Sequence, residues 1–486
     1  MSEATDPGGA GGDATLSKAA LRGSAVTVIG QGLGTIIRFG ANLIITRLLV
    51  PEHFGVMAIV NVFVMALYLF SDIGVGPNII QSKRGDDPVF LNTAWTTQVV
   101  RGLILALIAC ACGWPMAWLY GIPELTLLVP VAGLTAILGG LESTKLFTVN
   151  RSLSFVRLTA LELSTQLAGV LAMIAAGWWL RSVWALVVAA WVTSITKTVL
   201  SHALLPGPRN RLAWDRESRR SLFEFGRWIF VSTIFTFLAG QSDRLILGKL
   251  VTTVALGVYS IGANIAALPL QVINQVSSRV FFPVVAAAMR RADHDPAVIR
   301  RARVKLMLVL APLLALAVAM APPALTLLYD ERYHRAGTVA AFLAIGSWFA
   351  TISSSYGVVL LAMGRPKALS VANAAKLVSF ASLLWLAAAR YGIEGAALVV
   401  ALSEVAFLVV AQLAARRERV VTVAADLGIT CGVAALVGAY LGLHHLLLSQ
   451  TGSRVVALAV PVAAALCLTA AMAKKVRLLS GGEAGK

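Results

Sequence analysis

Runs of about 20 or more apolar residues, broken by short polar turns, fill almost the whole chain. A helix needs about 20 such residues to cross the hydrocarbon core of a membrane. The pattern therefore predicts an all-α, polytopic membrane protein. We expect fourteen membrane-spanning helices, near residues 22–48, 54–78, 91–113, 124–148, 157–179, 182–204, 221–247, 253–287, 299–320, 335–362, 367–388, 392–414, 420–443 and 453–473.

The composition agrees with a membrane protein. The 486 residues are 58% hydrophobic and 13% charged, whereas a soluble domain carries roughly 25% charged residues. The net charge of +18 fits basic loops at a membrane surface better than nucleic-acid binding, and no nucleic-acid partner is expected. The four cysteines lie in apolar segments, so we expect packing residues there. Neither a cofactor nor a metal is predicted.

Lysine and arginine set the expected orientation. Most of the 41 basic residues fall in the tails and loops of one side, including Arg300, Arg301 and Arg303, and only a few fall on the other. The positive-inside rule places the basic side, with both termini, in the cytoplasm. A faint repeat with an offset of close to 200 residues divides the chain further. The expected parts are a disordered N-terminal tail (1–16), an N-lobe (17–205), a basic linker (206–220), a C-lobe (221–415), two further helices (416–474) and a C-terminal tail (475–486).

The first predicted span carries one polar face. Gln31, Thr35, Arg38 and Asn42 follow spacings of three and four, so they share one side of a helix. Lipid cannot satisfy these groups, so this face must meet protein or water. Single Ser or Thr residues are more often bonded between packed helices. A full-length stripe with an arginine at mid-depth instead indicates a water-filled cavity.

Other spans carry polar residues that we expect to line the same cavity. They lie in the second, seventh, eighth and eleventh spans: Asn61, Arg244, Asn264, Gln271, Arg279, Asn373 and Lys376. The surplus charge at mid-depth is positive, so the substrate is expected to be anionic. Phosphates suit arginine particularly well.

Three acidic residues within the spans are candidates for coupling transport to an ion such as H⁺ or Na⁺: Asp72, Glu142 and Glu404. A structural hydrogen bond is the alternative for each of them.

Ion pairs are expected where a base follows an acid by one turn. Lys145 stands three residues after Glu142, which predicts a pair on one helix face, and Lys197 is expected to pair with Glu162. No acidic residue lies one turn from Lys376, so a role in the cavity is expected for it.

Two stretches resemble the polysaccharide transporter branch of the multidrug/oligosaccharidyl-lipid/polysaccharide exporter superfamily, which includes Wzx-type flippases. "TRLLVPEHFG" carries the first family pattern through Arg47, Leu49, Pro51, Phe54 and Gly55. "DRLILGKLVTTVALGVY" carries the second through Asp243, Arg244, Leu256, Gly257 and Tyr259.

The resemblance implies two six-helix lobes around a central cavity, followed by two more helices. It also implies a flippase of the bacterial inner membrane that moves undecaprenyl-diphosphate-linked oligosaccharide to the periplasmic leaflet by alternating access. The product would be an exopolysaccharide, capsule or O-antigen. Basic cavity residues, Arg38 foremost, would meet the diphosphate. A polysaccharide polymerase and export machinery are candidate partners.

Three alternatives remain open at this point. A peptidoglycan lipid II flippase would also have fourteen helices. A multidrug exporter of the same fold would favour acidic cavity groups for cationic drugs. A membrane polysaccharide polymerase or ligase would be expected to have larger outside loops than this chain has, so no enzymatic activity is predicted.

Overall fold

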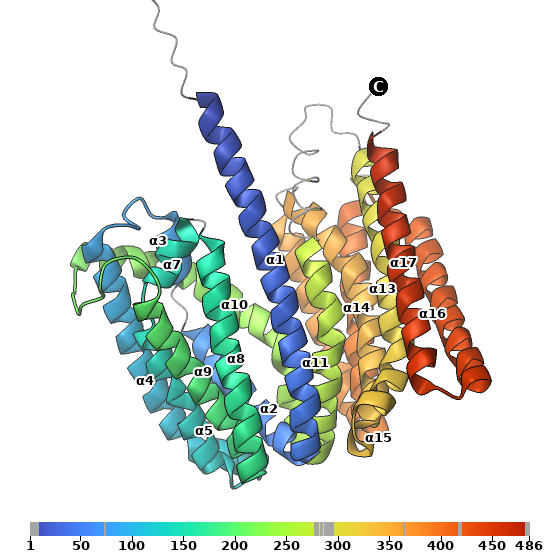
Figure 1. Ribbon diagram of the computed structural model, residues 1–486, viewed down its shortest axis with the longest axis horizontal. Coiled ribbons are helices and arrows are strands. Elements are labelled where there is room, and N and C mark those ends of the chain that lie inside the picture. The colour runs from blue at the N-terminus through green and yellow to red at the C-terminus, as the bar shows by residue number, and fades with distance from the viewer. Residues whose placement is uncertain are drawn as a thin grey trace, which may run out of the picture. The chain divides into compact units, whose positions relative to one another are not determined.

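Helices are the only regular elements among the described residues of the computed structural model (Figure 1). Those residues are 9–71, 74–152, 154–276, 281, 285, 296–362, 365–416 and 420–481. The all-α fold expected from the apolar pattern is confirmed. The chain forms two compact units, which are Met1–Ser242 (unit 1) and Asp243–Lys486 (unit 2).

Unit 1 contains nine helices and the first part of a tenth within the described residues. They are α1 (Gly9–Leu48), α2 (Pro51–Phe70), α3 (Val75–Gln81), α4 (Pro88–Tyr120), α5 (Leu125–Gly133), α6 (Thr135–Leu141), α7 (Lys145–Arg151), α8 (Phe155–Leu180), α9 (Trp184–Ala203) and α10 (Arg216–Leu250), which continues into unit 2.

Local sequence explains where several of these helices begin and end. α2 and α4 begin with Pro51 and Pro88, because the fixed φ of proline suits the first turn of a helix. The carboxylate of Asp87 caps α4 by accepting a hydrogen bond from the backbone N of Val89 at 2.9 Å. α4 ends where Gly121 takes a φ of 68°, a left-handed conformation that glycine adopts without strain.

Two predicted spans of unit 1 are broken helices. The span expected at 54–78 consists of α2 and α3, and the one expected at 124–148 consists of α5, α6 and α7. In the second span the chain bends by 56° between Leu125–Leu141 and Lys145–Arg151. A break inside a membrane exposes backbone groups that the protein must satisfy itself.

Arg101 of α4 supplies hydrogen bonds to polar groups at the break after α2. Its Nη2 donates to the carbonyl oxygen of Tyr68 at 2.7 Å, and its Nε donates to Ser71 Oγ at 2.8 Å. The last turn of α2 therefore keeps a partner although the helix stops there.

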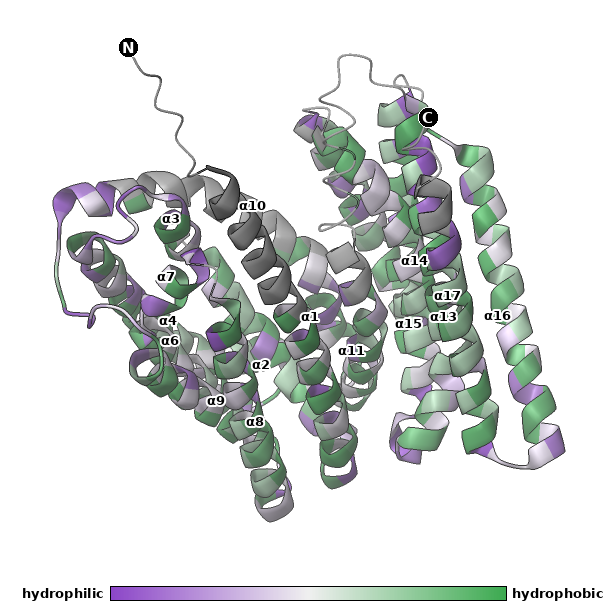
Figure 2. Ribbon diagram, turned by 45° about the horizontal axis from the view of Figure 1, so that its top comes forward, coloured by the Kyte–Doolittle hydropathy of each residue, from purple (hydrophilic) through white to green (hydrophobic). Residues whose placement is uncertain are grey.

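Unit 2 contains the remaining helices. They are the last part of α10, α11 (Thr253–Val276), α13 (Pro296–Leu328), the 3₁₀ helix η2 (Glu331–Tyr333), α14 (Arg335–Ala362), α15 (Pro366–Ala415), α16 (Val423–Thr451) and α17 (Arg454–Gly481). Gly392 in α15 has a φ of 63° and a ψ of −143°, so α15 comprises two helical segments, as the pattern predicts near that residue. Figure 2 shows many apolar residues along the coloured parts of the helices in both units.

A test of helix length and composition finds fewer membrane-spanning helices than the sequence pattern predicts. Ten helices of the described residues pass, or up to eleven if the bent pair counts as one span, so the expected fourteen are not confirmed. Part of the difference is that α15 counts once but covers two predicted spans. α1 and α10 lie where spans were expected but are not among the ten. The protein is a multi-pass membrane protein.

The predicted boundaries differ from the structure at two places. α1 begins at Gly9, inside the segment 1–16 for which a disordered tail was expected, because a long apolar helix extends cheaply once it is nucleated. The units divide between Ser242 and Asp243, within α10 and beyond the linker expected at 206–220.

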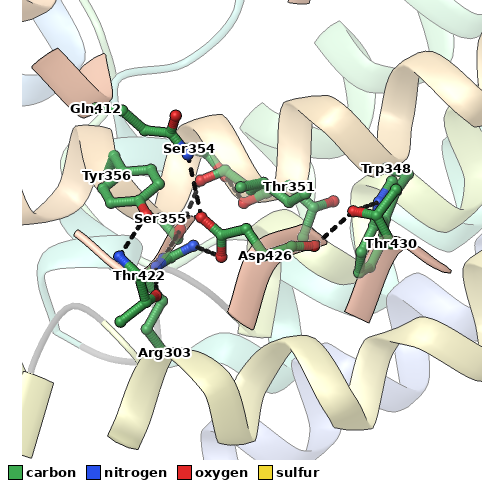
Figure 3. A network of polar contacts seen from close by, with 11 residues as sticks. Arg303, Trp348, Thr351, Ser354, Ser355, Tyr356, Gln412, Thr422, Asp426 and Thr430 are labelled. Atoms are coloured by element: carbon green, nitrogen blue, oxygen red, sulfur yellow. Dashed lines mark hydrogen bonds and ion pairs between the residues drawn. The ribbon is translucent and has the colours of Figure 1, made fainter. Parts of the chain in front are cut away.

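A buried arginine joins four helices of unit 2 (Figure 3). Arg303 of α13 is 0% exposed, although it was expected in a cytoplasmic loop. Its Nη2 donates to Asp426 of α16, its Nε donates to Ser355 of α14 at 2.8 Å, and its Nη1 donates to Thr422 at 2.7 Å. The guanidinium carbon lies 3.8 Å from the centre of the Tyr356 ring.

The carboxylate of Asp426 is equally well satisfied. It accepts hydrogen bonds from Tyr356 Oη at 2.6 Å and from Gln412 Nε2 of α15 at 3.2 Å. Two charges buried together are stable only when their remaining donors and acceptors are also paired. This network therefore fixes α16 to α13, α14 and α15.

Replacing Arg303 by alanine should lower the stability of the protein by about 3–5 kcal/mol, because Asp426 would keep a buried charge without its partner. The measurement is thermal unfolding of the purified protein in detergent. Replacing both residues, Arg303→Met with Asp426→Leu, should recover much of the loss. The control is Arg301→Ala, since Arg301 is exposed on the same helix. Equal losses in the two single variants would contradict the assignment.

Candidate functional site

Arg38 lies on the surface of unit 1 with two polar neighbours. Its Nη1 donates to Gln166 Oε1 of α8 at 3.1 Å, and its Nη2 donates to Thr35 Oγ1 at 3.2 Å. The side chain is exposed, and no carboxylate of the described residues forms an ion pair with it. The guanidinium therefore keeps its full positive charge and is held in one orientation.

Glycines in α1 allow this arrangement, because they bring α1 and α8 close together. A Cβ added at Gly30 would lie 2.0 Å from Thr159, and one added at Gly34 would lie 2.9 Å from Gln166 Oε1. Gln166 Nε2 also donates to the carbonyl oxygen of Gly34 at 2.5 Å. Gln166 is thus fixed by the α1 backbone at one end and orients Arg38 with the other.

The depth of Arg38 makes its exposure meaningful. It lies ten residues before the end of α1 at Leu48, which at 1.5 Å per residue is about 15 Å along the helix. The hydrocarbon core is about 30 Å thick, so Arg38 would lie near its middle where the end of the predicted span at Leu48 marks one membrane surface; this depth stays a prediction. A charge at this depth faces the bundle interior or water in nearly all membrane proteins.

Most of the other predicted cavity residues are also exposed on the surface of their own unit. Polar side chains that merely bonded between packed helices would be buried instead. Thr35, Asn42, Arg244 and Lys376 are partly buried, and six of the predicted residues are exposed: Gln31, Arg38, Asn61, Asn264, Gln271 and Asn373.

Two predicted cavity residues of unit 2 are in direct contact. Arg244 Nη2 of α10 donates to Asn264 Oδ1 of α11 at 3.2 Å. The neighbouring Asp243 accepts a hydrogen bond at 2.7 Å from the hydroxyl of Tyr259, which is fully buried in α11. The second signature stretch, in which Asp243 and Tyr259 both lie, thus holds α10 and α11 together and positions Arg244.

Lys376 has an acidic partner, contrary to expectation. Its Nζ forms an ion pair with Glu404, which lies on the other segment of α15. The break at Gly392 folds the two segments back so that residues 28 positions apart meet. The charge of Lys376 is therefore balanced by Glu404, whereas Arg38 of unit 1 has no carboxylate partner among the described residues.

The ion pairs expected for Glu142 and Lys197 are wrong. Lys197 of α9 pairs with Glu142 at 2.8 Å, and not with Glu162. Lys145 Nζ donates to the carbonyl oxygen of His202 at 2.9 Å, and not to Glu142. The helix breaks between α6 and α7, at Glu142, so the spacing of three residues no longer places the two side chains on one face.

Two of the predicted site residues, Asp72 and Arg279, lie outside the described residues. Gln166 is part of the site and was not predicted. A glutamine within an apolar span was the available signal, but nothing in the sequence pairs it with Arg38. The described residues contain no group of three or more His, Cys, Asp or Glu that could hold a metal ion.

Solved structures with a similar fold are membrane transporters. The lipid II flippase MurJ in an inward closed conformation superposes with a TM-score of 0.70 and 11% identity, covering 92% of this chain and 98% of MurJ. A multidrug resistance MATE family transporter of the MOP superfamily in its inward-facing conformation superposes with a TM-score of 0.56 and 12% sequence identity. The match covers 83% of this chain and 95% of the transporter. At these identities the similarity shows the fold alone.

Curated relatives are about one-fifth identical. The teichuronic acid biosynthesis protein TuaB of Bacillus subtilis is 23% identical over 60% of this chain and 61% of its own length. The succinoglycan biosynthesis transport protein ExoT of Rhizobium meliloti is 23% identical over 68% of this chain and 66% of its own length. The lipopolysaccharide biosynthesis protein WzxC of Escherichia coli is 22% identical over 69% of this chain and 69% of its own length. The chain thus spans about three-fifths to two-thirds of these relatives.

A family model matches the middle part of the chain, which includes α8 but not Arg38 of α1. The match runs through residues 44–338, which is more than half of the chain and includes both signature stretches. The family is described as polysaccharide biosynthesis protein. The chain belongs to this polysaccharide biosynthesis protein family.

Proposed function

We propose that this protein moves a lipid-linked, diphosphate-bearing oligosaccharide across the bacterial inner membrane by alternating access, and that Arg38 binds the diphosphate. The substrate would be an undecaprenyl-diphosphate-linked unit of an exopolysaccharide, capsule or O-antigen. Transport would run from the cytoplasmic to the periplasmic leaflet, with both termini in the cytoplasm.

The family and its relatives support a polysaccharide substrate. The names of three relatives refer to teichuronic acid, succinoglycan and lipopolysaccharide synthesis, and one of them is called a transport protein. The fold is shared with a lipid II flippase and with multidrug transporters. A transporter of this fold for a lipid-linked saccharide fits both observations.

The observation that carries the proposal is the state of Arg38. It is exposed, held by Gln166 and Thr35, and lacks a carboxylate partner among the described residues. A fixed guanidinium with open donors matches the oxygens of a phosphate, which it can bind through two hydrogen bonds. Within unit 1, Asn61 offers an amide for the sugar hydroxyls, and a cationic site disfavours the cationic drugs of a multidrug exporter.

We also propose Asp72, Glu142 and Glu404 as the residues that couple transport to H⁺ or Na⁺. Glu142 and Glu404 each pair with a lysine, Lys197 and Lys376 respectively. Protonation of either carboxyl group would leave that lysine unpaired, and this would favour a different helix arrangement.

Arg38→Ala should lower the rate of flipping about tenfold or more, because a charge-assisted hydrogen bond to the diphosphate is lost. Arg38→Lys should keep part of the rate, since the charge remains without the two-pronged geometry. The assay is movement of a labelled undecaprenyl-diphosphate sugar in proteoliposomes. Arg157→Ala, which removes an exposed arginine of α8, should leave the rate unchanged. A normal rate for Arg38→Ala would refute the assignment.

Gln166→Glu should inhibit transport although Arg38 is still present. The new carboxylate would lie within hydrogen-bond reach of Arg38 and neutralise it. Gln166→Leu removes the hydrogen bonds of Gln166 to Arg38 and to Gly34. It adds no negative charge, so the positive charge of Arg38 stays available to the substrate. In the same proteoliposome assay the leucine variant should therefore be the faster of the two. If the glutamate variant is equal or faster, the charge of Arg38 is not what the substrate requires.

Glu404→Gln should reduce the acceleration of flipping by an ion gradient, because glutamine mimics a permanently protonated carboxyl group. Proton and sodium gradients are imposed in turn on the proteoliposomes, and the ratio of rates with and without each gradient is compared with the native protein. Glu124→Gln serves as control, since Glu124 is an exposed residue before α5. Unchanged ratios for both Glu404→Gln and Glu142→Gln would exclude these two residues from coupling.

A further inference from the structure

The segment between α9 and α10 is fastened to unit 1 along its length. Backbone N–H groups of alternate residues donate to side chains of α4: Arg211 to Asn92 Oδ1 at 3.0 Å, Ala213 to Thr96 Oγ1 at 3.0 Å, and Asp215 to Thr93 Oγ1 at 3.1 Å. We call residues 209–216 the strap. Its regular contacts with one helix show that it is no loose loop.

Both ends of the strap are held as well. At the start, Asn210 accepts a hydrogen bond from Ser143 Oγ and donates one to Thr144 Oγ1, each at 2.6 Å. After its end, Leu222 of α10 is fully buried in a cluster with residues of α3 and α4. The orientation of the strap side chains is therefore fixed.

The fastened strap presents apolar side chains outward. Leu212 is 72% exposed and Trp214 is 53% exposed. They alternate with Arg211, Ala213 and Asp215, whose backbone N–H groups point to α4. A leucine and a tryptophan held on the outside of a protein need an apolar or interfacial environment.

The exposed charge of the strap is positive. Arg209, Arg211 and Arg216 are exposed, and none has a carboxylate partner among the described residues. Asp215 is occupied locally: the hydroxyl of Ser218 donates to it at 2.6 Å and holds the pKa of this carboxyl group below its ordinary value. Glu217, just after the strap, lies 3.5 Å from Arg84.

The strap lies against the N-terminal end of α4, where we expect a membrane surface. α4 has 33 residues and is therefore about 50 Å long, so it is longer than a core of about 30 Å and reaches beyond it. Thr93 and Thr96, which hold the strap, lie in its second and third turns. Val100 and Leu103 follow at spacings of four and seven from Thr96, on the same helix face, and are exposed. The strap thus covers the lipid-facing stripe of α4 where this stripe reaches the surface.

We propose that the strap is a binding site for anionic phospholipid: Leu212 and Trp214 insert at the boundary between headgroups and acyl chains, and Arg209, Arg211 and Arg216 bind the phosphate groups. Tryptophan prefers this interface, and each basic residue near an anionic surface adds to the attraction. The strap shares no residue with the site proposed at Arg38 and does not depend on the transported substrate.

Fluorescence of Trp214 tests the apolar part of the proposal. The full-length protein is placed in nanodiscs of zwitterionic lipid with increasing phosphatidylglycerol, and the signal of Trp214→Phe is subtracted from that of the native protein. The difference should be quenched by lipids brominated near the carbonyl end of the chains and protected from aqueous acrylamide. Quenching by acrylamide and not by the brominated lipids would show that the strap faces water, and would overturn the proposal.

The charge is tested with the variant R209Q/R211Q/R216Q. Its enrichment of phosphatidylglycerol over zwitterionic lipid, measured by native mass spectrometry of the protein with bound lipids, should be about tenfold weaker than that of the native protein. The matched control R47Q/R390Q/R454Q removes three other exposed arginines at the ends of α1, of the first segment of α15 and of α17, and should retain the enrichment at the strap. Equal enrichment in the strap variant and the native protein would contradict binding of phosphates by these arginines.

Discussion

The structure depends on one constraint, which is that the hydrocarbon core supplies no hydrogen-bond partner. A polar group placed there must be satisfied by the protein or must face water. Arg101 meets this condition by bonding to the broken end of α2. Arg303 meets it in a buried network with Asp426, and Lys376 meets it through Glu404. Arg38 differs, because it has only neutral partners and stays exposed.

This difference separates basic side chains that stabilise the fold from one that is available to bind a substrate. A buried arginine with a carboxylate partner has little free energy left to offer to a substrate, since its donors are already used. An arginine held by an amide and a hydroxyl remains fully charged and can bind an anion without first breaking an ion pair. Gln166 is therefore as much part of the site as Arg38, because it orients the guanidinium without cancelling its charge.

The sequence was sufficient to locate the helices, but it was insufficient to predict which side chains form ion pairs between them. Apolar runs located the segments that became α4, α8 and α14, because burial in lipid depends on local composition. Pairing depends on which helices touch. Glu142 meets Lys197 and not Lys145 because the helix breaks between α6 and α7. Arg303 meets Asp426 across 123 positions of the chain, and its place near a helix start made it resemble an ordinary basic loop residue.

The route of the chain between the two units limits how they can influence each other. Residues 210–215 are tied to unit 1, and the chain continues from them into α10, which is helical from Arg216 to Leu250 and crosses the boundary at Ser242. A slack tether would leave each unit free to turn independently. A continuous helix instead joins the last residues of unit 1 to the first residues of unit 2 without a flexible break.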